Sequence, residues 1–152
     1  VLDDSVAYAS ERIQFGRPIG KFQAIQQMLA VLAGRVAAAE TAVDAMWRAV
    51  DRHGFADAFP EIAAAKIRAG EAATLAANTG HEVHGAIGFA HEHHLNFLTR
   101  RLWAWRGEYG GDGGWAVALG RHVAARGAER LWSDITARNE QSTNEQTARE
   151  KT

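Results

Sequence analysis

One apolar stripe constrains the fold of this chain more than any other feature of its sequence. From Lys21 onward, large apolar side chains recur at intervals of three and four residues, which is the period of one helix face. The members of this stripe are Phe22, Ile25, Leu29, Leu32, Val36, Val43, Met46 and Val50. The pattern predicts a single long helix that ends near His53 and Gly54 and that needs other helices to cover its apolar face.

Shorter helical patterns lie on both sides of this stripe. The expected helices cover residues 2–14, 21–54, 61–79, 95–105 and 115–132. Glycine and proline separate them, at Gly16, Pro18 and Gly20, at a turn over 55–60, and at glycine-bearing segments near 80–88 and 107–114. No alternating pattern is long enough for a strand. The sequence therefore predicts an all-α fold, an up-and-down four-helix bundle.

Length and charge limit the class of protein further. The 152 residues suffice for one domain, expected over residues 1–133, and the polar residues 134–152 are expected to form a disordered tail. The 17 Lys and Arg residues balance 18 Asp and Glu residues, which argues against a nucleic-acid binder. Cysteine is absent, which excludes disulfides, thiol nucleophiles and cysteine-ligated metals.

The ends and the hydropathy of the chain give expectations about its location. The sequence begins with Val1 and not with an initiator Met, and its first residues do not have the pattern of a signal peptide. We therefore expect the chain to be part of a longer protein. No apolar run is long enough to span a membrane. We expect a cytoplasmic protein.

Histidines form the densest polar cluster, in the segments His81–His84 and His91–His94. Two imidazoles three residues apart can share a helix face, so a zinc or iron site is one hypothesis. The spacing fits neither the zinc-protease pattern nor the Glu-x-x-His pattern of di-iron bundles. We therefore expect no metal site and interpret the cluster as a polar loop between helices.

The segment Glu11–Gln23 carries more information about function. Arg12 offers a planar fork that suits a diphosphate, Gln14 can donate or accept a hydrogen bond, and Phe15 offers a face for a planar ring. The helix that follows contributes its positive N-terminal end. These residues indicate contact with an anion or a nucleotide; the alternative is a helix corner with solvated arginines.

Four segments together resemble the C-terminal domain of the acyl-CoA dehydrogenases. They are Glu11–Gln23, Ala63–Lys66, His84–Phe89, which resembles the family's Gly-Gly-x-Gly loop, and the Arg100–Arg101 pair. Their order and spacing fit the family, and the resemblance covers about Val1 to Trp132.

The resemblance implies a helical bundle that assembles into a dimer or tetramer, with like or unlike subunits, and helps to hold FAD bound mainly by another subunit. The implied FAD-contacting residues are Arg12, Gln14, Phe15, Phe22, Gln23, Glu82, Gly85 and Ala86. Glu82 stands where the family usually has Gln, and Ala86 replaces the second Gly of the loop. A carboxylate beside a diphosphate is unfavourable unless it is protonated or turned away.

The resemblance also implies a reaction, the α,β-desaturation of an acyl-CoA with electrons passed on to an acceptor. In many members the base is the Glu of a Glu-Gly-Thr turn. Here Tyr109, followed by Gly110 and Gly111, occupies the ungapped position, and the neighbouring Glu108 is the candidate base. The alternative for Glu108 is an exposed carboxylate near a helix start, and some members place the base upstream of this region.

These observations leave more than one function open. The first is the FAD-contacting and assembly domain of an acyl-CoA dehydrogenase-like enzyme involved in fatty acid metabolism, inactive as an isolated chain. The second is a non-catalytic assembly subunit or helical binding module without flavin. The aromatic stretch Leu102–Arg106 fits a subunit interface or a core.

Overall fold

The computed structural model describes residues 1–137, which form parts of two compact units, Val1–Ala116 and Val117–Thr152. The helices are α1 (Leu2–Glu11), α2 (Gln23–Asp57), α3 (Phe59–His84), α4 (His94–Gly107) and α5 (Asp112–Arg126). The shorter elements are strands β1 (Ile13–Gln14) and β2 (Arg17–Pro18) and the 3-10 turns η1 (Ile19–Lys21), η2 (Gly85–Phe89) and η3 (Ala128–Arg130). The predicted all-α fold is confirmed.

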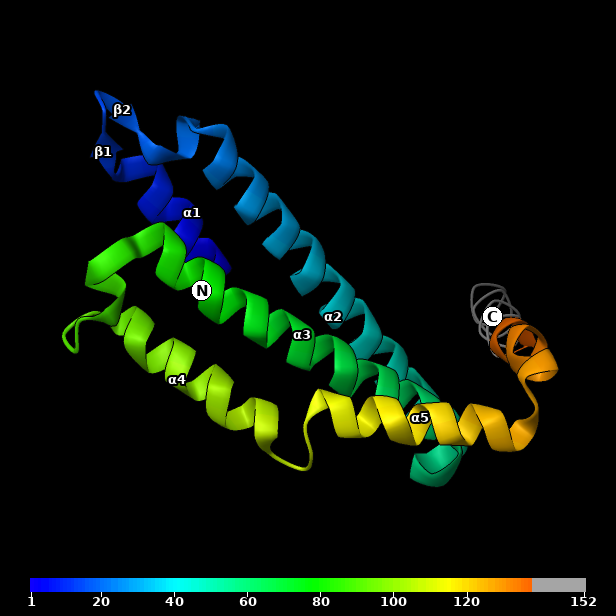
Figure 1. Ribbon diagram of the computed structural model, residues 1–152. Helices are drawn as coiled ribbons and strands as arrows, with labels where there is room; N and C mark the ends of the chain where they lie inside the picture. Colours follow the sequence, from blue (N-terminus) through cyan, green and yellow to red (C-terminus); the bar gives the residue numbers. More distant parts are fainter. Residues whose placement is uncertain (138–152) are drawn as a thin grey trace, which may run out of the picture. The chain divides into compact units, whose positions relative to one another are not determined.

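Helices α2 and α3 form the centre of the first unit. They lie side by side in opposite directions, and α4 runs back along α3 (Figure 1). The short α1 packs against the C-terminal half of α3 and the start of α2. From α1 to α4, each helix thus reverses the direction of the one before it, which is the expected up-and-down order.

Small side chains dominate the core of this unit. Five alanines on α3 are buried, namely Ala63, Ala65, Ala72, Ala76 and Ala77. Leu32 on α2 and Leu95 on α4 are the largest apolar side chains that are fully buried. Alanine contributes little transfer free energy, but it lets neighbouring helix backbones approach closely.

Two glycines were expected to end helices, and only Gly80 behaves differently. Gly80 was expected to end the third helix, but α3 continues to His84 because Gly80 serves close packing. A Cβ there would lie 3.0 Å from Val1 Cγ1 and 3.2 Å from Leu95 Cδ1. Gly54, by contrast, adopts a left-handed φ of 77° and kinks α2 where the helix was expected to end. Only Ala58 separates α2 from α3, so the expected turn over 55–60 is shorter than predicted, with Pro60 in the first turn of α3.

The first break in the chain contains the only two strands among the described residues. β1 and β2 pair antiparallel, with Gln14 opposite Arg17 and Ile13 opposite Pro18. Strands of two residues are too short to show a period of two in the sequence, which is why no strand was predicted. α1 consequently ends at Glu11, three residues before the expected end.

The second unit is described by residues 117–137. Gly127, at a φ of 92°, ends α5 where the sequence predicted an unbroken helix to residue 132. Arg126 Nε donates to Asp134 Oδ2 at 2.7 Å. Residues 134–137 of the expected tail are helical, and 138–152 lie outside the described residues. Within the described part of the chain, none of the helices has the length and apolar character needed to cross a membrane.

Candidate functional site

The segment Glu11–Gln23 folds into a tight β-hairpin. Phe15 and Gly16 are its two central residues, with φ values of 52° and 76°. Positive φ at both positions defines the turn whose twist matches that of paired strands. Beyond the strands, Ile19 N donates to Arg12 O at 2.8 Å. The hairpin therefore has a fixed backbone, and Phe15 at its tip is 92% exposed.

Aromatic and cationic side chains of the hairpin contact Phe22, which follows it in the chain. The rings of Phe15 and Phe22 lie edge to face, with their centroids 6.0 Å apart. The guanidinium of Arg17 lies over the Phe22 ring, 4.2 Å from its centroid. Arg12 is exposed on the same hairpin. The structure thus brings Phe15, Arg17 and Phe22 together, with Arg12 exposed in the same segment.

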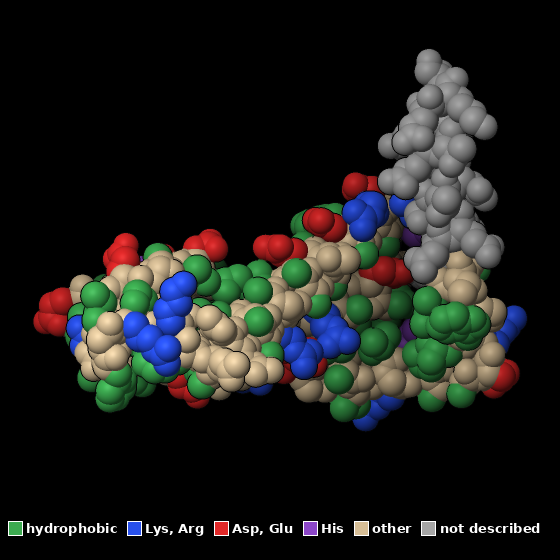
Figure 2. All heavy atoms as spheres, turned by 90° about the horizontal axis from the view of Figure 1, so that it is seen from above, with side chains coloured by type: hydrophobic (Ala, Val, Ile, Leu, Met, Phe, Trp, Pro, Cys, Tyr) green, Lys and Arg blue, Asp and Glu red, His purple; other side chains and the backbone are tan. Residues whose placement is uncertain are grey.

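The N-terminus of α2 opens directly beside these residues. Among the described residues, no side chain caps the first amides of α2, and its first turn contains no acidic residue. Gln26 Nε2 donates to Gly20 O at 2.9 Å, which fixes η1 against the helix start. Figure 2 shows Lys and Arg side chains gathered at this end of the molecule. Uncapped amides with nearby cations attract an anion.

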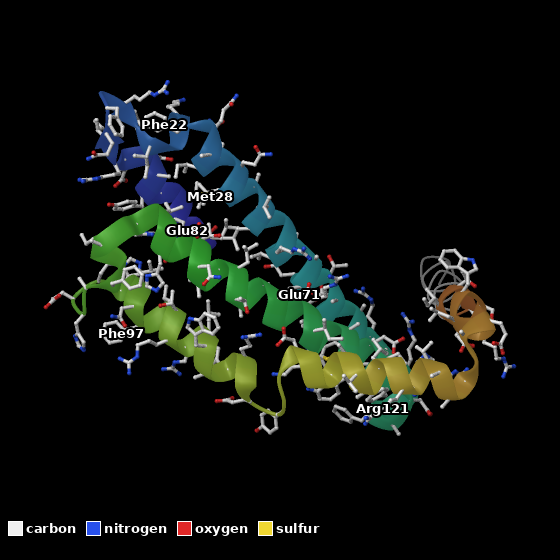
Figure 3. The ribbon with its side chains drawn as sticks, in the orientation of Figure 1. Phe22, Met28, Glu71, Glu82, Phe97 and Arg121 are labelled. Atoms are coloured by element: carbon white, nitrogen blue, oxygen red, sulfur yellow. The ribbon has the colours of Figure 1, made fainter. Side chains whose placement is uncertain are left out.

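The other predicted cofactor residues lie at the end of α3. Glu82 is exposed in the last turn, and Phe22 and Glu82 lie toward the same end of the first unit (Figure 3). Gly85 adopts a φ of 64° where α3 passes into η2, and Ala86 follows it on the surface. The structure thus brings both groups of predicted residues to one end of the bundle.

A buried histidine fixes this end of α3. His84 as a whole residue is only 5% exposed. Its ring stacks on Tyr8 of α1, with centroids 4.4 Å apart, and its Nδ1 lies 2.8 Å from Gly80 O. Burial lowers the pKa of His84 below 6.5. Repulsion from His93 and His94 acts in the same direction, and the Gly80 carbonyl and Asp4 act against it. His84 is therefore a neutral packing group that joins α1 to α3.

His93 lies between two other histidines: its ring stacks on His94 with centroids 4.8 Å apart and meets the His84 ring edge to face at 5.2 Å. His81 Nε2 lies 3.0 Å from Thr99 Oγ1, and His94 Nε2 lies 3.2 Å from Asp4 Oδ2. Residues 1–137 contain no group of three or more His, Cys, Asp or Glu side chains placed to hold a metal ion.

Glu108 follows the C-terminal end of α4, whereas the predicted cofactor residues at the end of α3 lie near the N-terminal end of α4 (Figure 1). The helix has 14 residues and therefore spans about 20 Å. Glu108 is exposed, and Tyr109 is 92% exposed at a φ of 58°. Asp112, the other nearby carboxylate, is paired with Arg106 at 3.0 Å. The predicted base and the predicted cofactor residues of one chain are thus not brought together.

Three residues at these sites were not predicted to take part in them. Arg17 stands in the quoted segment, yet its stacking on Phe22 depends on the unpredicted hairpin. Lys66 stands in the quoted Ala63–Lys66 segment, and Trp115 follows the glycine loop. Lys66 donates a hydrogen bond to the carbonyl of Glu108, 42 residues further along the chain, and Trp115 donates one to the carbonyl of Tyr109, 6 residues before it. Only the fold reveals these contacts.

Comparison with known proteins identifies the fold. Residues 1–119 match the family described as acyl-CoA dehydrogenase, C-terminal domain. Acyl-CoA dehydrogenase FadE34 of Mycobacterium tuberculosis is 38% identical over 135 residues, which are 88% of this chain and 19% of that protein.

Solved structures agree with this match. The ChsE4-ChsE5 complex from Mycobacterium tuberculosis contains a chain similar to this one at a TM-score of 0.75 and 31% identity, covering 81% of this chain and 33% of that one. The Tcur3481-Tcur3483 steroid ACAD, solved as a variant, reaches a TM-score of 0.76 at 28% identity, covering 84% of this chain and 35% of that one. The chain spans 19% to 26% of the length of the first curated relatives that it matches. With its helices in the predicted up-and-down order and its family motifs in place, this chain belongs to the acyl-CoA dehydrogenase family and corresponds to that family's C-terminal helical domain.

Proposed function

We propose that this chain is the FAD-contacting and assembly domain of an enzyme that desaturates an acyl-CoA thioester between its α- and β-carbons. The observation that carries the proposal is the rigid hairpin at the start of α2. It carries the exposed Phe15 ring, the Arg17 guanidinium over Phe22 and the exposed Arg12, and it leads into the uncapped N-terminus of α2. This combination suits a nucleotide diphosphate joined to a planar ring.

The residues present fit FAD in charge and in shape. Arg12 and the uncapped amides of α2 would contact the diphosphate, together with the main chain at Gly85. Phe15 would pack against the cofactor, and Phe22 and Gln23 would lie toward its adenine. Glu82 is exposed and can turn away from the diphosphate. A bound FAD supplies an acceptor for the hydride that leaves the β-carbon.

We assign the removal of the substrate's α-proton to Glu108. Removal of that proton needs a carboxylate within reach of the thioester's α-carbon. No ion pair to the Glu108 carboxylate is found in the described part of the chain, whereas Asp112 is occupied by Arg106. The carboxylate takes the proton as the α C–H bond breaks and the α,β double bond forms.

Exposed apolar side chains support the assembly role. The large apolar side chains that are exposed on α2 and α4 are Val31, Trp47, Phe55, Phe97, Leu98, Trp103 and Trp105. Figure 2 shows apolar side chains on a face of the molecule between the charged ones. Surfaces of this kind mark contacts with other proteins. The two similar solved structures carry the names of two components each, and we propose that this chain likewise works beside a second dehydrogenase-type subunit, like or unlike.

The test uses the complete protein in which this domain occurs. Arg12→Ala should lower FAD retention after gel filtration, measured by flavin absorbance, by about tenfold or more, because a charge-assisted contact is lost. Arg48→Ala, which removes an exposed arginine in the C-terminal half of α2, is the matched control and should retain wild-type flavin. If Arg12→Ala binds FAD as tightly as wild type, the cofactor proposal fails.

Tyr109 favours a second candidate, an assembly subunit that contacts flavin but supplies no base. Tyr109 occupies the ungapped base position, and a tyrosine hydroxyl is a poor general base compared with a carboxylate. Glu108→Gln separates the two candidates. Loss of desaturation with FAD retained supports Glu108 as base, and unchanged desaturation supports the second candidate.

A further inference from the structure

The loop that joins α4 to α5 has an unusual backbone for a segment with two exposed functional side chains. Glu108 is extended, at φ −63° and ψ 135°, and Tyr109 follows at φ 58° and Gly110 at φ 94°. A left-handed φ is unfavourable for a residue with a Cβ, so a tyrosine keeps it only where surrounding contacts impose it. The structure shows what those contacts are.

Lys66 of α3 provides the first contact. Its Nζ donates to Glu108 O at 2.7 Å and lies 3.4 Å from Trp105 O. The last carbonyls of a helix have no partner within the helix, so an ammonium placed there both satisfies them and fixes where the chain leaves. Lys66 therefore binds the main chain of Glu108.

Trp115 of α5 provides the second contact. Its indole Nε1 donates to Tyr109 O at 3.0 Å. The indole is itself held by Phe59 of α3, with ring centroids 6.1 Å apart. A Cβ on Gly110 would lie 3.4 Å from Trp115 Nε1, so the loop passes directly beneath the indole. Two successive carbonyls, those of Glu108 and Tyr109, are thus bound by side chains of two different helices.

An ion pair closes the loop on its other side. Arg106 in the last turn of α4 binds Asp112, the first residue of α5, at 3.0 and 3.4 Å. Asp112 fits closely over Gly70 of α3, where an added Cβ would lie 2.9 Å from the Asp112 Cβ. The two ends of the loop are therefore joined to each other and to α3.

We propose that Lys66 and Trp115 are positioning residues that hold the main chain of residues 108–111, so that Glu108 and Tyr109 project from a fixed loop into the reaction site. The inference concerns backbone geometry, and its catalytic consequence rests on the assignment of Glu108 as base. A carboxylate on a free loop would sample many positions, whereas proton abstraction needs one. A misplacement of about 1 Å can lower a rate about 100-fold.

Lys66→Met in the complete protein tests this directly, because methionine keeps much of the aliphatic stem and removes the donor. Amide hydrogen exchange of residues 108–111 should become at least about tenfold faster, and kcat should fall about tenfold to 100-fold with KM and FAD content unchanged. Trp115→Phe, which keeps a ring against Phe59 and removes the indole N–H, should act in the same direction.

Two matched variants complete the design. Lys66→Arg retains a donor that can reach the same carbonyls, so it should restore part of the lost kcat. Arg68→Met lies on the same helix and loses only its exposed ion pair with Glu71, so its loop exchange and kcat should equal those of wild type.

The outcomes separate this inference from the proposed function. Unchanged amide exchange of the loop in both Lys66→Met and Trp115→Phe would overturn the inference. If Glu108→Gln is inactive, faster loop exchange with unchanged kcat in Lys66→Met and Trp115→Phe would overturn it as well. Faster exchange beside a fully active Glu108→Gln would refute the assigned base and leave the proposed hold on the loop supported.

Discussion

At the scale of single residues, Phe15 shows most clearly a conflict between folding and function. It stands at φ 52°, where a residue with a Cβ costs about 1 to 2 kcal/mol, and its ring is 92% exposed. An Asn-Gly pair would suit this turn better than Phe-Gly. Folding alone therefore does not explain the phenylalanine, whereas the proposed contact with a flavin would.

Phe15→Asn tests this explanation. We expect the free energy of unfolding to rise by up to about 1 kcal/mol, because asparagine tolerates the left-handed conformation. Flavin affinity should fall in the same variant, because the ring is lost. Thermal unfolding without FAD and fluorescence titration with FAD measure the two effects, and Phe15→Tyr should keep wild-type affinity. A variant that loses stability and keeps its flavin would show that the ring serves the fold.

His84 gives a pH dependence at the same scale. Because burial holds its pKa below 6.5, the folded state binds a proton less readily than the unfolded state. The stabilisation from neutral His84 is therefore complete above pH 6.5 and decreases as the pH falls below that value. We expect the urea midpoint of unfolding to decrease from pH 7 to pH 5. His84→Gln should reduce this decrease, and an identical pH profile in wild type and variant would contradict the assignment.

At the scale of helices, the sequence pattern predicts existence and direction better than ends. The stripe from Phe22 to Val50 identifies α2 because all of its side chains are buried or half-buried in the structure. The prediction for Gly80 was wrong because the sequence does not distinguish a glycine that ends a helix from a glycine at a close contact between helices. Only the distance to Val1 and Leu95 distinguishes them. The hairpin escaped prediction because its two strands are set by turn geometry and are too short for a pattern.

The predicted site shows the same limit. The motif residues of the hairpin were found because they are contiguous in sequence. Lys66 and Trp115 were not, because their targets are backbone carbonyls, which carry no sequence signature. Contacts to the main chain are therefore the part of this site that required a structure.

Two glycines of the first unit give a matched prediction about helix packing. Gly70 lies so close to Asp112 that an added Cβ would be 2.9 Å from its Cβ, whereas Gly34, exposed on α2, has nothing within 4 Å. Gly70→Ala should destabilise the protein by about 1 kcal/mol, since overpacking outweighs the gain in helix propensity. Gly34→Ala should stabilise it by about 0.5 to 1 kcal/mol. Urea denaturation of both variants measures this, and equal shifts would mean that the Gly70 crossing relaxes freely.

At the scale of the whole molecule, the two predicted sites of one chain lie at opposite ends of α4. A flavin held by the hairpin of one subunit would therefore serve the Glu108 loop of another. The chain spans about a quarter or less of its first curated relatives, so this arrangement belongs to the complete protein and not to the isolated domain.

Mixing two inactive variants of the complete protein tests this arrangement. Arg12→Glu should disable flavin binding in the neighbouring subunit, and Glu108→Gln should disable the chemistry in its own. In a mixed homodimer one site then retains both its base and its cofactor contacts. Random pairing places the two variants together in half of the dimers, so about a quarter of wild-type desaturation should return after subunits are dissociated and reassembled together. If Arg12 and Glu108 instead served a site within one subunit, every site in the mixture would carry one defect and no activity would return.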